Sequence, residues 1–359
     1  MVSYLRMSSK RGLVLADDAT GALECASLLS GFEVAIALNT EQSVDEGILV
    51  ADTETRHLLP GEAGRRIARW ASLTDAAIFK KTDSTLRGNI AAELLALLPR
   101  GPLVYVPAYP ALGRTVQNGR LLIHGVPVDQ TDFARDARHP VRSPVIADLF
   151  PPELAVSIGD ATELVDFLKR GLRKIAICDA TSDAELDRLT GALQGSYVTV
   201  TVAGPGGFVK AWASLGAYPR KFLAPTPSVG DWLVVCGSRH PQSRRQARLA
   251  ELAGLPVLVS AEEERLPEVV AAELAQRAVG WIAAHRRGQA GRPVLPLGVL
   301  VMGGDTAWAL WRELAITQLI PLPEVLPGVA VCRSGELVFV TKAGGFGGDD
   351  LVARVRERF

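Results

Sequence analysis

Charged side chains gather directly after short apolar runs in the first half of the chain. Asp17 and Asp18 follow the run LVLA, and Arg56 follows ILVADTET. Two adjacent carboxylates can accept hydrogen bonds from hydroxyl groups or hold a hydrated Mg²⁺ ion, and a guanidinium group can bind a planar carboxylate through paired hydrogen bonds. Each motif alone has a plainer interpretation, since Asp18 or Thr20 could cap a helix and Arg56 could form a surface ion pair.

The segment AIFKKTDSTLRGN carries the densest group of polar residues. Its candidates for contact with a ligand are Lys81, Asp83, Ser84 and Arg87. Cations, hydroxyls and one acid placed after a buried run suit a small molecule that bears both carboxylate and hydroxyl groups. The alternative is that Asp83 or Ser84 caps a helix while the cations face water. A later segment, VPAYPALGRT, adds Arg114 to these substrate candidates, although Gly and Pro are also ordinary loop residues.

Glycine-rich turns follow apolar runs in the last third of the chain. The residues that they present are Ser238 in CGS, Gly303, Gly304, Asp305 and Thr306 in GGDT, and Lys342, Gly344, Gly345 and Gly347 in KAGGFGG. Glycine lets the backbone approach a phosphate closely, and the exposed amides at the start of a helix bind anions. Neither loop is a Walker A motif or a GxGxxG fingerprint, and one such loop is as often a tight turn. Two in one domain favour a nucleotide site.

Charge and composition exclude several classes of protein. The 39 basic and 39 acidic residues give a formal net charge of 0, so no long-range field attracts nucleic acid or an anionic membrane. The five histidines lack metal-ligand spacing and no GxSxG elbow is present, which disfavours zinc enzymes and serine hydrolases. The four cysteines are far apart and three lie in apolar runs, as expected of core residues in a reducing compartment.

No run of the sequence reaches the roughly 18 apolar residues that a membrane span needs. We therefore expect a soluble, cytoplasmic protein. Either Met1 or Met7 could be its first residue, and a homo-oligomer is left open.

Short apolar runs alternate with helical stretches along most of the chain. This alternation predicts an α/β fold with a largely parallel sheet, and such sheets bind ligands beyond the carboxyl ends of their strands. A chain of 359 residues exceeds what one core usually serves, and the Pro-rich text LAPTPSVGD breaks the pattern. We expect two domains, residues 1–225 and 230–359, each a mostly parallel sheet flanked by helices. Residues 114–148 show no clear periodicity and predict a long loop that is functional or mobile.

Taken together, the motifs resemble the four-carbon acid sugar kinase family, formerly described as a domain of unknown function. The matching segments, which occur in the family's order, are ADDATGA at 16–22, DTETR at 52–56, KKTDSTLRGN at 80–89, PAYPALGRT at 107–115, GS at 237–238, GGDTA at 303–307 and KAGGFGG at 342–348. The resemblance implies ATP-dependent phosphorylation of the terminal hydroxyl of a threonate, erythronate or 3-oxo-tetronate type of acid. It also implies an N-terminal substrate domain, a C-terminal nucleotide domain and an active site in the cleft between them.

The resemblance also assigns residues at matched positions. Those expected to contact ATP are Ser238, Gly303 to Thr306 and Gly345, and those expected around the substrate are Asp17, Arg56, Lys81, Asp83 and Arg87. Phosphoryl transfer needs positioning, charge stabilisation and a magnesium ion. We expect Lys81 and Arg87 to orient the substrate's carboxylate. Asp305 is the candidate for accepting the hydroxyl proton or holding Mg²⁺, with Asp17 or Asp83 as rival base.

Two departures from the family's pattern bear on the substrate more than on the reaction: the chain is short for the family, and CGSRHPQ replaces a more usual serine-rich text. A non-catalytic homologue, or a kinase for a different small hydroxy acid, would carry similar motifs. A nicotinamide oxidoreductase would need GxGxxG with an acid about twenty residues later, and the sequence lacks this fingerprint.

Overall fold

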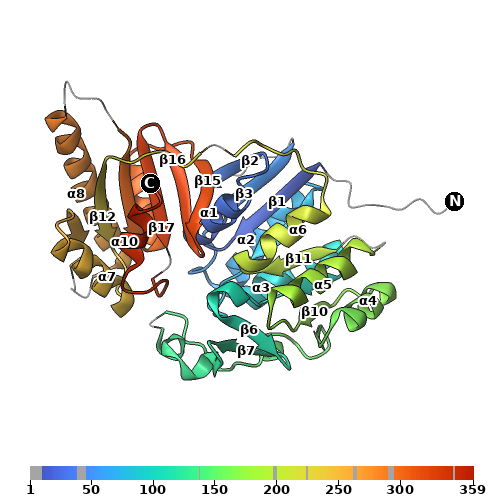
Figure 1. The fold of residues 1–359 in the computed structure, drawn as a ribbon. Helices are drawn as coiled ribbons and strands as arrows, with labels where there is room; N and C mark the ends of the chain where they lie inside the picture. The colour runs from blue at the N-terminus through green and yellow to red at the C-terminus, as the bar shows by residue number, and fades with distance from the viewer. Residues whose placement is uncertain are drawn as a thin grey trace. The chain divides into compact units, whose positions relative to one another are not determined.

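Two compact units make up the chain in the computed structural model, Met1–Lys221 and Phe222–Phe359 (Figure 1). The structure describes residues 10–38, 46–136, 138–196, 200–223, 225–261, 265–289, 295–342 and 344–359. The division between the units falls just before the Pro-rich segment that the sequence suggests as a linker. Ala224 of that segment, and the two possible start residues Met1 and Met7, lie outside the described residues.

An eight-stranded sheet forms the middle of the first unit, in the part of the chain that the structure describes. Its strand order is β2-β3-β1-β4-β11-β5-β10-β9, and neighbouring strands are parallel throughout. The strands are β1 (Arg11–Ala16), β2 (Val34–Leu38), β3 (Gly47–Asp52), β4 (Ala77–Lys81), β5 (Leu103–Tyr105), β9 (Ala155–Ile158), β10 (Ile175–Cys178) and β11 (Thr201–Gly204). Runs such as LVLA and IAIC are apolar on both sides because helices cover both faces of a parallel sheet.

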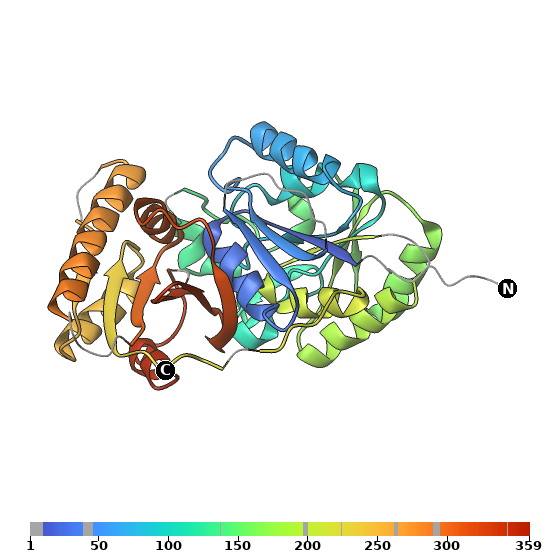
Figure 2. The same ribbon diagram turned by 90° about the horizontal axis from the view of Figure 1, so that it is seen from above.

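Helices lie on both faces of this sheet. α1, α6 and α5 lie on one face, and α2 and α3 pack against each other on the opposite face (Figure 2). The helical segments are α1 (Ala19–Leu28), α2 (Pro60–Ser72), α3 (Ile90–Leu95), α4 (Ala161–Arg170), α5 (Asp183–Gln194), α6 (Val209–Leu215) and the 3-10 turns η1 (Leu98–Arg100) and η6 (Gly206–Phe208). Local sequence fixes their ends: Asp160 caps the start of α4, and Gly171, in the left-handed conformation, follows its last residue.

The segment between β5 and β9 forms a small antiparallel sheet. Its strands are β6 (Arg114–Gln117), β7 (Arg120–Ile123) and β8 (Val126–Pro127), accompanied by the 3-10 turns η2 (Pro110–Leu112), η3 (Val128–Gln130), η4 (Asp132–Arg135) and η5 (Ile146–Leu149). The pairs Asn118-Gly119 and His124-Gly125, all with positive φ, turn the chain between the strands. The interpretation of residues 114–148 as a loop was therefore wrong, because strands of two to four residues are too short to show an alternating pattern.

A six-stranded mixed sheet forms the middle of the second unit, again among the described residues. Its order is β13-β12-β14-β17-β16-β15; the first four strands are parallel, and β16 and β15 extend the sheet in antiparallel fashion. The strands are β12 (Asp231–Cys236), β13 (Val257–Val259), β14 (Leu297–Met302), β15 (Ile320–Leu326), β16 (Val329–Ser334) and β17 (Leu337–Lys342). The apolar runs predict the four parallel strands. The sequence interpretation missed β15, whose text IPLPEVL is interrupted by two prolines, and also β16, whose text is VAVCRS.

Four helices of the second unit pack in pairs among the described residues: α7 (Pro241–Leu252) with α10 (Leu351–Arg356), and α8 (Pro267–Gly288) with α9 (Gly304–Glu313). Each unit has a hydrophobic core of its own. The predicted two-domain α/β fold is confirmed. Cys25, Cys178, Cys236 and Cys332 are all buried thiols, as their apolar surroundings suggest. Among the described helices, none combines the length and the apolar character that crossing a bilayer requires.

Candidate functional site

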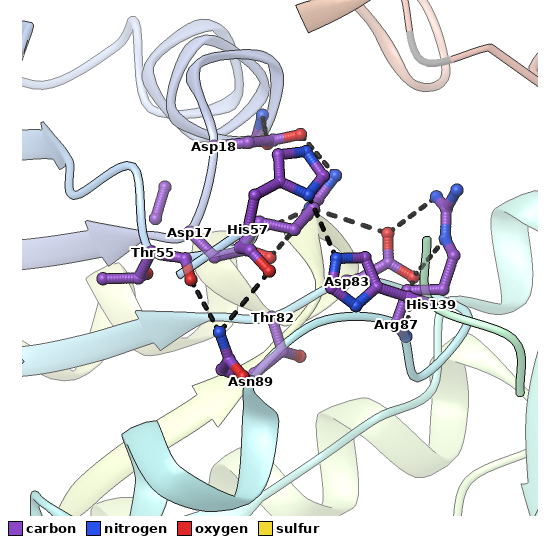
Figure 3. Close-up of polar contacts among 12 residues, drawn as sticks. Asp17, Asp18, Thr55, His57, Thr82, Asp83, Arg87, Asn89 and His139 are labelled. Carbon is purple, nitrogen blue, oxygen red and sulfur yellow. Dashed lines mark hydrogen bonds and ion pairs between the residues drawn. The ribbon is translucent and has the colours of Figure 1, made fainter. Parts of the chain in front are cut away.

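Three loops meet at the carboxyl edge of the first unit's sheet. β1 pairs with β3 on one side and with β4 on the other, so the segments that follow these strands are neighbours. These segments are residues 17–18, 53–56 and 82–87, and Figure 3 shows polar side chains from all three directed toward one another. Most of the substrate candidates expected from the sequence are thus brought together.

The Arg56 guanidinium group lies between three carboxylates. Its Nε and Nη2 atoms donate to the two carboxylate oxygens of Asp17, at 2.7 and 3.0 Å. Nη1 donates to Asp18 Oδ2, and Nη2 lies 3.6 Å from Asp83 Oδ2. The backbone amide of Gly21 also donates to Asp18 Oδ1, at 2.7 Å. Asp18 therefore caps α1, as one interpretation of the sequence has it, and pairs with Arg56 as well.

A second guanidinium group, that of Arg87, continues this cluster. Its Nη2 and Nε atoms lie 2.9 and 3.3 Å from the two oxygens of Asp83. Its Nη1 atom donates to Asp136 Oδ2 at 3.1 Å, and the guanidinium carbon lies 5.2 Å from the centroid of the Phe133 ring. Both partners belong to the segment around η4, so this segment is attached to the carboxyl edge of the large sheet.

Two histidines form a second link between the same parts of the first unit. His57 Nδ1 and His139 Nε2 are 3.0 Å apart, and the two rings stack with centroids 5.2 Å apart (Figure 3). The backbone amide of His139 donates to Asp136 Oδ1 at 2.9 Å. Burial lowers the pKa of His139, and the positive charges of Arg56 and Arg87 act in the same direction. The negative charge of Asp136 acts in the opposite direction, but the pKa stays below its usual value. A hydrogen bond between two imidazoles requires that one of them be neutral.

The buried acids of the cluster remain ionised at neutral pH. Burial alone would raise the pKa of Asp17, but the charges of Arg56, Lys80 and Lys81 outweigh it, so the pKa lies below its usual value. Burial opposes ionisation of Asp83 as well, and its arginine partners lower the pKa in the same way. Both carboxylates are therefore poor proton acceptors. This geometry does not support the sequence interpretation that either of them is the catalytic base.

The two lysines at the end of β4 point into the protein. Lys80 Nζ lies 3.0 Å from Glu93 Oε2, and both side chains are almost fully buried. Lys81 Nζ lies 3.5 Å from Glu24 Oε2 and donates to the carbonyl of Thr82 at 2.9 Å. Burial opposes the charge of Lys81, yet the charges of Glu24 and Asp17 raise its pKa above the usual value. Lys81 is thus a charged group beneath the carboxylate cluster.

Solvent exposure separates the members of the cluster into two groups. The side chains of Asp18 and Arg87 are 22% and 23% exposed, whereas that of Asp17 is 2% exposed. Of the remaining candidates, Ser84 is half-buried in the same turn as Asp83. Arg114 is buried at the start of β6 and donates to the carbonyl of Leu112. The accessible groups of the cluster are therefore the carboxylates of Asp18 and Asp136 and the guanidinium of Arg87, held in place by buried partners.

The carboxylates of this cluster are directed at arginines. Within the described ranges, no group of three acidic, histidine or cysteine side chains is arranged to hold a metal ion. Asp17 and Asp18, which the sequence suggests as candidates for a hydrated Mg²⁺ ion, both accept hydrogen bonds from Arg56 in ion pairs.

A second set of candidates lies at the carboxyl edge of the other unit's sheet. β14 lies between β12 and β17, so the turns after these three strands are neighbours. They contain Ser238, residues 303–306 and residues 344–348. A Cβ atom added to Gly237 would lie 1.8 Å from Thr306 Oγ1, and one added to Gly344 would lie 2.8 Å from Ser238 Oγ. The three turns therefore approach one another so closely that glycine is needed.

Within this second set, the acid and the lysine differ in exposure. Asp305 is exposed in the first turn of α9, where Gly303, with φ of 118°, precedes the helix. Thr306 is buried beside Gly237. Lys342 is fully buried and directs its ammonium group at the carbonyl oxygens of Gly344 and Phe346. Lys342 therefore lies under the glycine loop, while Asp305 faces solvent.

Several residues of these two sites were missed by sequence reasoning. They are Glu24, His57, Glu93, Asp136 and His139 in the first unit, and Gln246 in the second. Asp136 lies 49 positions from Arg87 in a stretch without a motif. Gln246 lies four residues after the text CGSRHPQ, and nothing in its spacing connects it with the glycine loop about a hundred positions later.

Two family models match the chain. Residues 12–212 match the sugar-binding N-terminal domain, and residues 296–352 match the nucleotide-binding C-terminal domain. A D-threonate kinase of Cupriavidus necator is 30% identical, with 94% of this chain and 95% of that protein covered. A D-erythronate kinase of Heliobacterium modesticaldum is 31% identical over 67% of this chain and 60% of that protein. Further relatives are named 3-oxo-tetronate kinases.

A solved structure is also similar. A Bordetella bronchiseptica protein, described as a domain-swapped dimer with bound citrate, is 25% identical, with a TM-score of 0.50 and 98% of both chains covered. The sugar-binding model covers more than half of this chain, and relatives matched over nearly their full length are sugar-acid kinases. The chain therefore belongs to the four-carbon acid sugar kinase family.

Proposed function

We propose that this kinase uses ATP to phosphorylate the terminal hydroxyl of a four-carbon sugar acid of the threonate, erythronate or 3-oxo-tetronate type. The observation that carries the proposal is the cluster of Arg56, Arg87 and their carboxylate partners at the carboxyl edge of β1, β3 and β4. It offers both acceptors for hydroxyls and a donor for a carboxylate, which a polyhydroxy acid requires.

Exposure suggests which groups of the cluster would touch the substrate. Asp18 and Arg87 are accessible, whereas Asp17 and Asp83 are buried and hold the two guanidinium groups. In this proposal Asp18 accepts hydrogen bonds from substrate hydroxyls, and Arg87 binds the carboxylate in exchange for part of its contact with Asp136. Asp17, Arg56, Lys81, Asp83 and Ser84 keep these groups in position, and Arg114 supplies positive charge nearby.

The nucleotide would bind to the glycine turns of the second unit. The proposed ATP contacts are Ser238, Gly303, Gly304, Asp305, Thr306, Gly344, Gly345 and Gly347, with Lys342 beneath them. ATP brings Mg²⁺, which usually keeps several waters and takes only one or two protein carboxylates. Asp305 is an exposed carboxylate beside these glycines, so it fits either as a ligand of that ion or as the acceptor of the hydroxyl proton. That the active site lies in a cleft between the domains stays a prediction.

The test is a substrate screen with the purified protein. We would measure ADP release with ATP, Mg²⁺ and a panel of D- and L-threonate, D- and L-erythronate, 3-oxo-tetronates and longer hydroxy acids, and locate the phosphate by ³¹P NMR. We expect one four-carbon acid to be phosphorylated at its terminal oxygen with the largest kcat/KM. If the protein binds ADP but turns over no acid, it is a non-catalytic homologue. Turnover confined to another class of hydroxy acid would refute the proposed substrate.

A homo-oligomer is a further part of this proposal, supported by the domain-swapped dimer of the Bordetella relative. Light scattering coupled to size-exclusion chromatography would give the mass in solution. A mass equal to one chain of 38.3 kDa would contradict it.

A further inference from the structure

The glycine loop after β17 turns its carbonyl oxygens toward the interior of the second unit. The Gly344 carbonyl accepts from Ser243 Oγ at 2.6 Å and from Lys342 Nζ at 3.1 Å. The Phe346 carbonyl accepts from Lys342 Nζ at 3.0 Å. Buried carbonyls need such donors, so the loop's conformation depends on the side chains beneath it.

One side chain, Gln246, accounts for most of this support. Its Nε2 atom lies 3.0, 3.0 and 2.7 Å from the carbonyl oxygens of Phe346, Gly347 and Gly348, so its two hydrogens are shared among three acceptors. Its Oε1 atom accepts from Lys342 Nζ at 2.6 Å. The Gln246 side chain is 0% exposed, and every polar atom that it has is used.

Helix α7 positions this support. Gln246 and Ser243 are three residues apart, which places both on the same face of α7, toward the glycine loop. The two side chains together bind the carbonyls of four of the five residues 344–348. The helix thus fixes the orientation of successive peptide groups in the loop.

The amides of the loop are left for another partner. Each held carbonyl belongs to the same peptide group as the amide of the next residue, and within the described ranges the amides of Gly345, Gly347 and Gly348 donate no hydrogen bond to the protein. A run of peptides whose carbonyls are held on one side presents its N–H groups on the other, which is how a backbone loop binds anions. Gly345 and Gly344 also lie against His240 and Ser238, so these amides lie beside the other predicted phosphate contacts.

We propose that Gln246 is a positioning residue for the phosphates of the nucleotide: it holds three carbonyls of the loop inward so that the loop's amides face the phosphate groups. This inference rests on the proposed function of the second unit. It requires no contact between Gln246 and the nucleotide, since Gln246 acts through the backbone of residues 346–348.

The test compares two substitutions at this position with a control on the same helix. Gln246→Glu keeps the size and an acceptor for Lys342 but cannot donate to the carbonyls, and Gln246→Met keeps only the size. Gln242→Ala is the control, because its amide group donates to Asp349 Oδ1 at the surface and not to the loop. The readouts are the dissociation constant of ADP by calorimetry, the KM of ATP, the KM of the sugar acid and the midpoint of urea unfolding.

We expect Gln246→Glu and Gln246→Met to raise the ADP dissociation constant and the KM of ATP roughly ten- to hundredfold, since the carbonyls of residues 346–348 lose the donor that holds them inward. The KM of the sugar acid should change less than twofold, and Gln242→Ala should bind ADP as the wild type does. A folded Gln246→Glu protein with wild-type affinity for ADP would overturn the inference. If the wild type itself binds no ADP, the proposed nucleotide function fails instead.

Discussion

Arg87 is the residue at which a substrate contact and a structural contact can be told apart. Its guanidinium fork binds both oxygens of Asp83 and reaches Asp136, and its side chain is accessible. We expect Arg87→Lys to raise the KM of the sugar acid roughly ten- to hundredfold, because an ammonium group keeps the charge but loses the paired geometry. The KM of ATP should stay within twofold of the wild type, as measured by steady-state kinetics.

Arg100→Lys is the matched control for this substitution. Arg100 donates to the carbonyls of Ala71, Thr74 and Ala76, before β4 and away from the carboxyl edge of the sheet. Its replacement should lower stability and leave both KM values unchanged. If Arg100→Lys and Arg87→Lys altered the KM of the sugar acid equally, Arg87 would have no special role in binding.

Lys342 predicts how nucleotide binding depends on pH. Burial lowers the pKa of Lys342 to about 8, although the neighbouring thiol of Cys236 acts in the opposite direction. Below pH 8 the group is charged beneath the glycine loop, and above pH 8 it loses its proton and the positive charge that favours phosphate. We expect kcat/KM for ATP to fall as pH rises through 8, because this quantity reports the free enzyme. Lys342→Arg, which stays charged, should flatten the profile; an unchanged profile in that variant would contradict the assignment.

At the scale of single residues, the sequence indicates chemistry but not partners. Asp17, Asp18, Arg56 and Arg87 were predicted because each follows an apolar run, and parallel strands bring such positions to one edge. Asp136 was not predicted, since its contact with Arg87 depends on the path of a segment without a motif. The expectation that Arg56 is open to a substrate carboxylate did not foresee that Asp17 already binds it at two atoms.

At the scale of elements, the His57 and His139 pair is one of two links between the segment around η4 and the carboxyl edge of the large sheet. The charged groups that act on the pKa of His139 are Asp136, Arg56, Arg87 and Asp83. As the pH falls below the lowered pKa of His139, its imidazole becomes charged beside the positive charges of Arg56 and Arg87, which destabilises this link. We expect the KM of the sugar acid to rise between pH 7 and 5.

His139→Phe separates this link from general acid effects. The ring keeps its stacking on His57 but neither titrates nor accepts a hydrogen bond. Its KM for the sugar acid should be raised at pH 7 and depend less on pH between 7 and 5 than that of the wild type. Identical pH profiles for the two proteins would show that the histidine link does not affect the site.

Two glycines of the second unit predict opposite effects of the same substitution. A Cβ atom at Gly237 would lie 1.8 Å from Thr306 Oγ1, whereas one at Gly280, inside α8, would meet nothing within 4 Å. We expect Gly237→Ala to lower the free energy of unfolding by about 1–3 kcal/mol and to weaken ADP binding. Gly280→Ala should raise it by about 0.5–1 kcal/mol, since alanine favours a helix. Urea unfolding of both variants measures the difference, and equal midpoints would contradict the packing of these turns.

The elements that the sequence predicted are those with long apolar runs. Most parallel strands of both sheets were expected because their apolar runs stand out in the sequence, whereas β9, whose text AVSI is half exposed, was not. The sheet β6-β7-β8 was missed because its strands are short, and β15 because prolines interrupt it. β16 was also missed, although its six residues begin with the apolar run VAVC. Their pairing is decided by positive-φ turns such as Asn118-Gly119, whose effect depends on the strands on either side.

At the scale of the whole molecule, the two separate cores predict that binding functions can be divided between the units. Buried apolar clusters lie within each unit, so each has the means to fold alone. We expect a protein of residues 222–359 to unfold cooperatively in urea and to bind ADP within about tenfold of the full chain, because the glycine loop, Gln246 and Lys342 all belong to it. A protein of residues 1–221 should fold and bind no ADP.

Mixing the two separate proteins should restore very little kinase activity at micromolar concentrations. A covalent connection gives joined domains an effective concentration in the millimolar range, and two unlinked units lose this advantage. The measurement is ADP release at increasing concentrations of one unit with the other held constant, and activity should rise without saturating. ADP binding by residues 1–221 would contradict the division of roles, and so would a folded 222–359 protein that binds none, since the phosphate contacts would then require residues of the first unit.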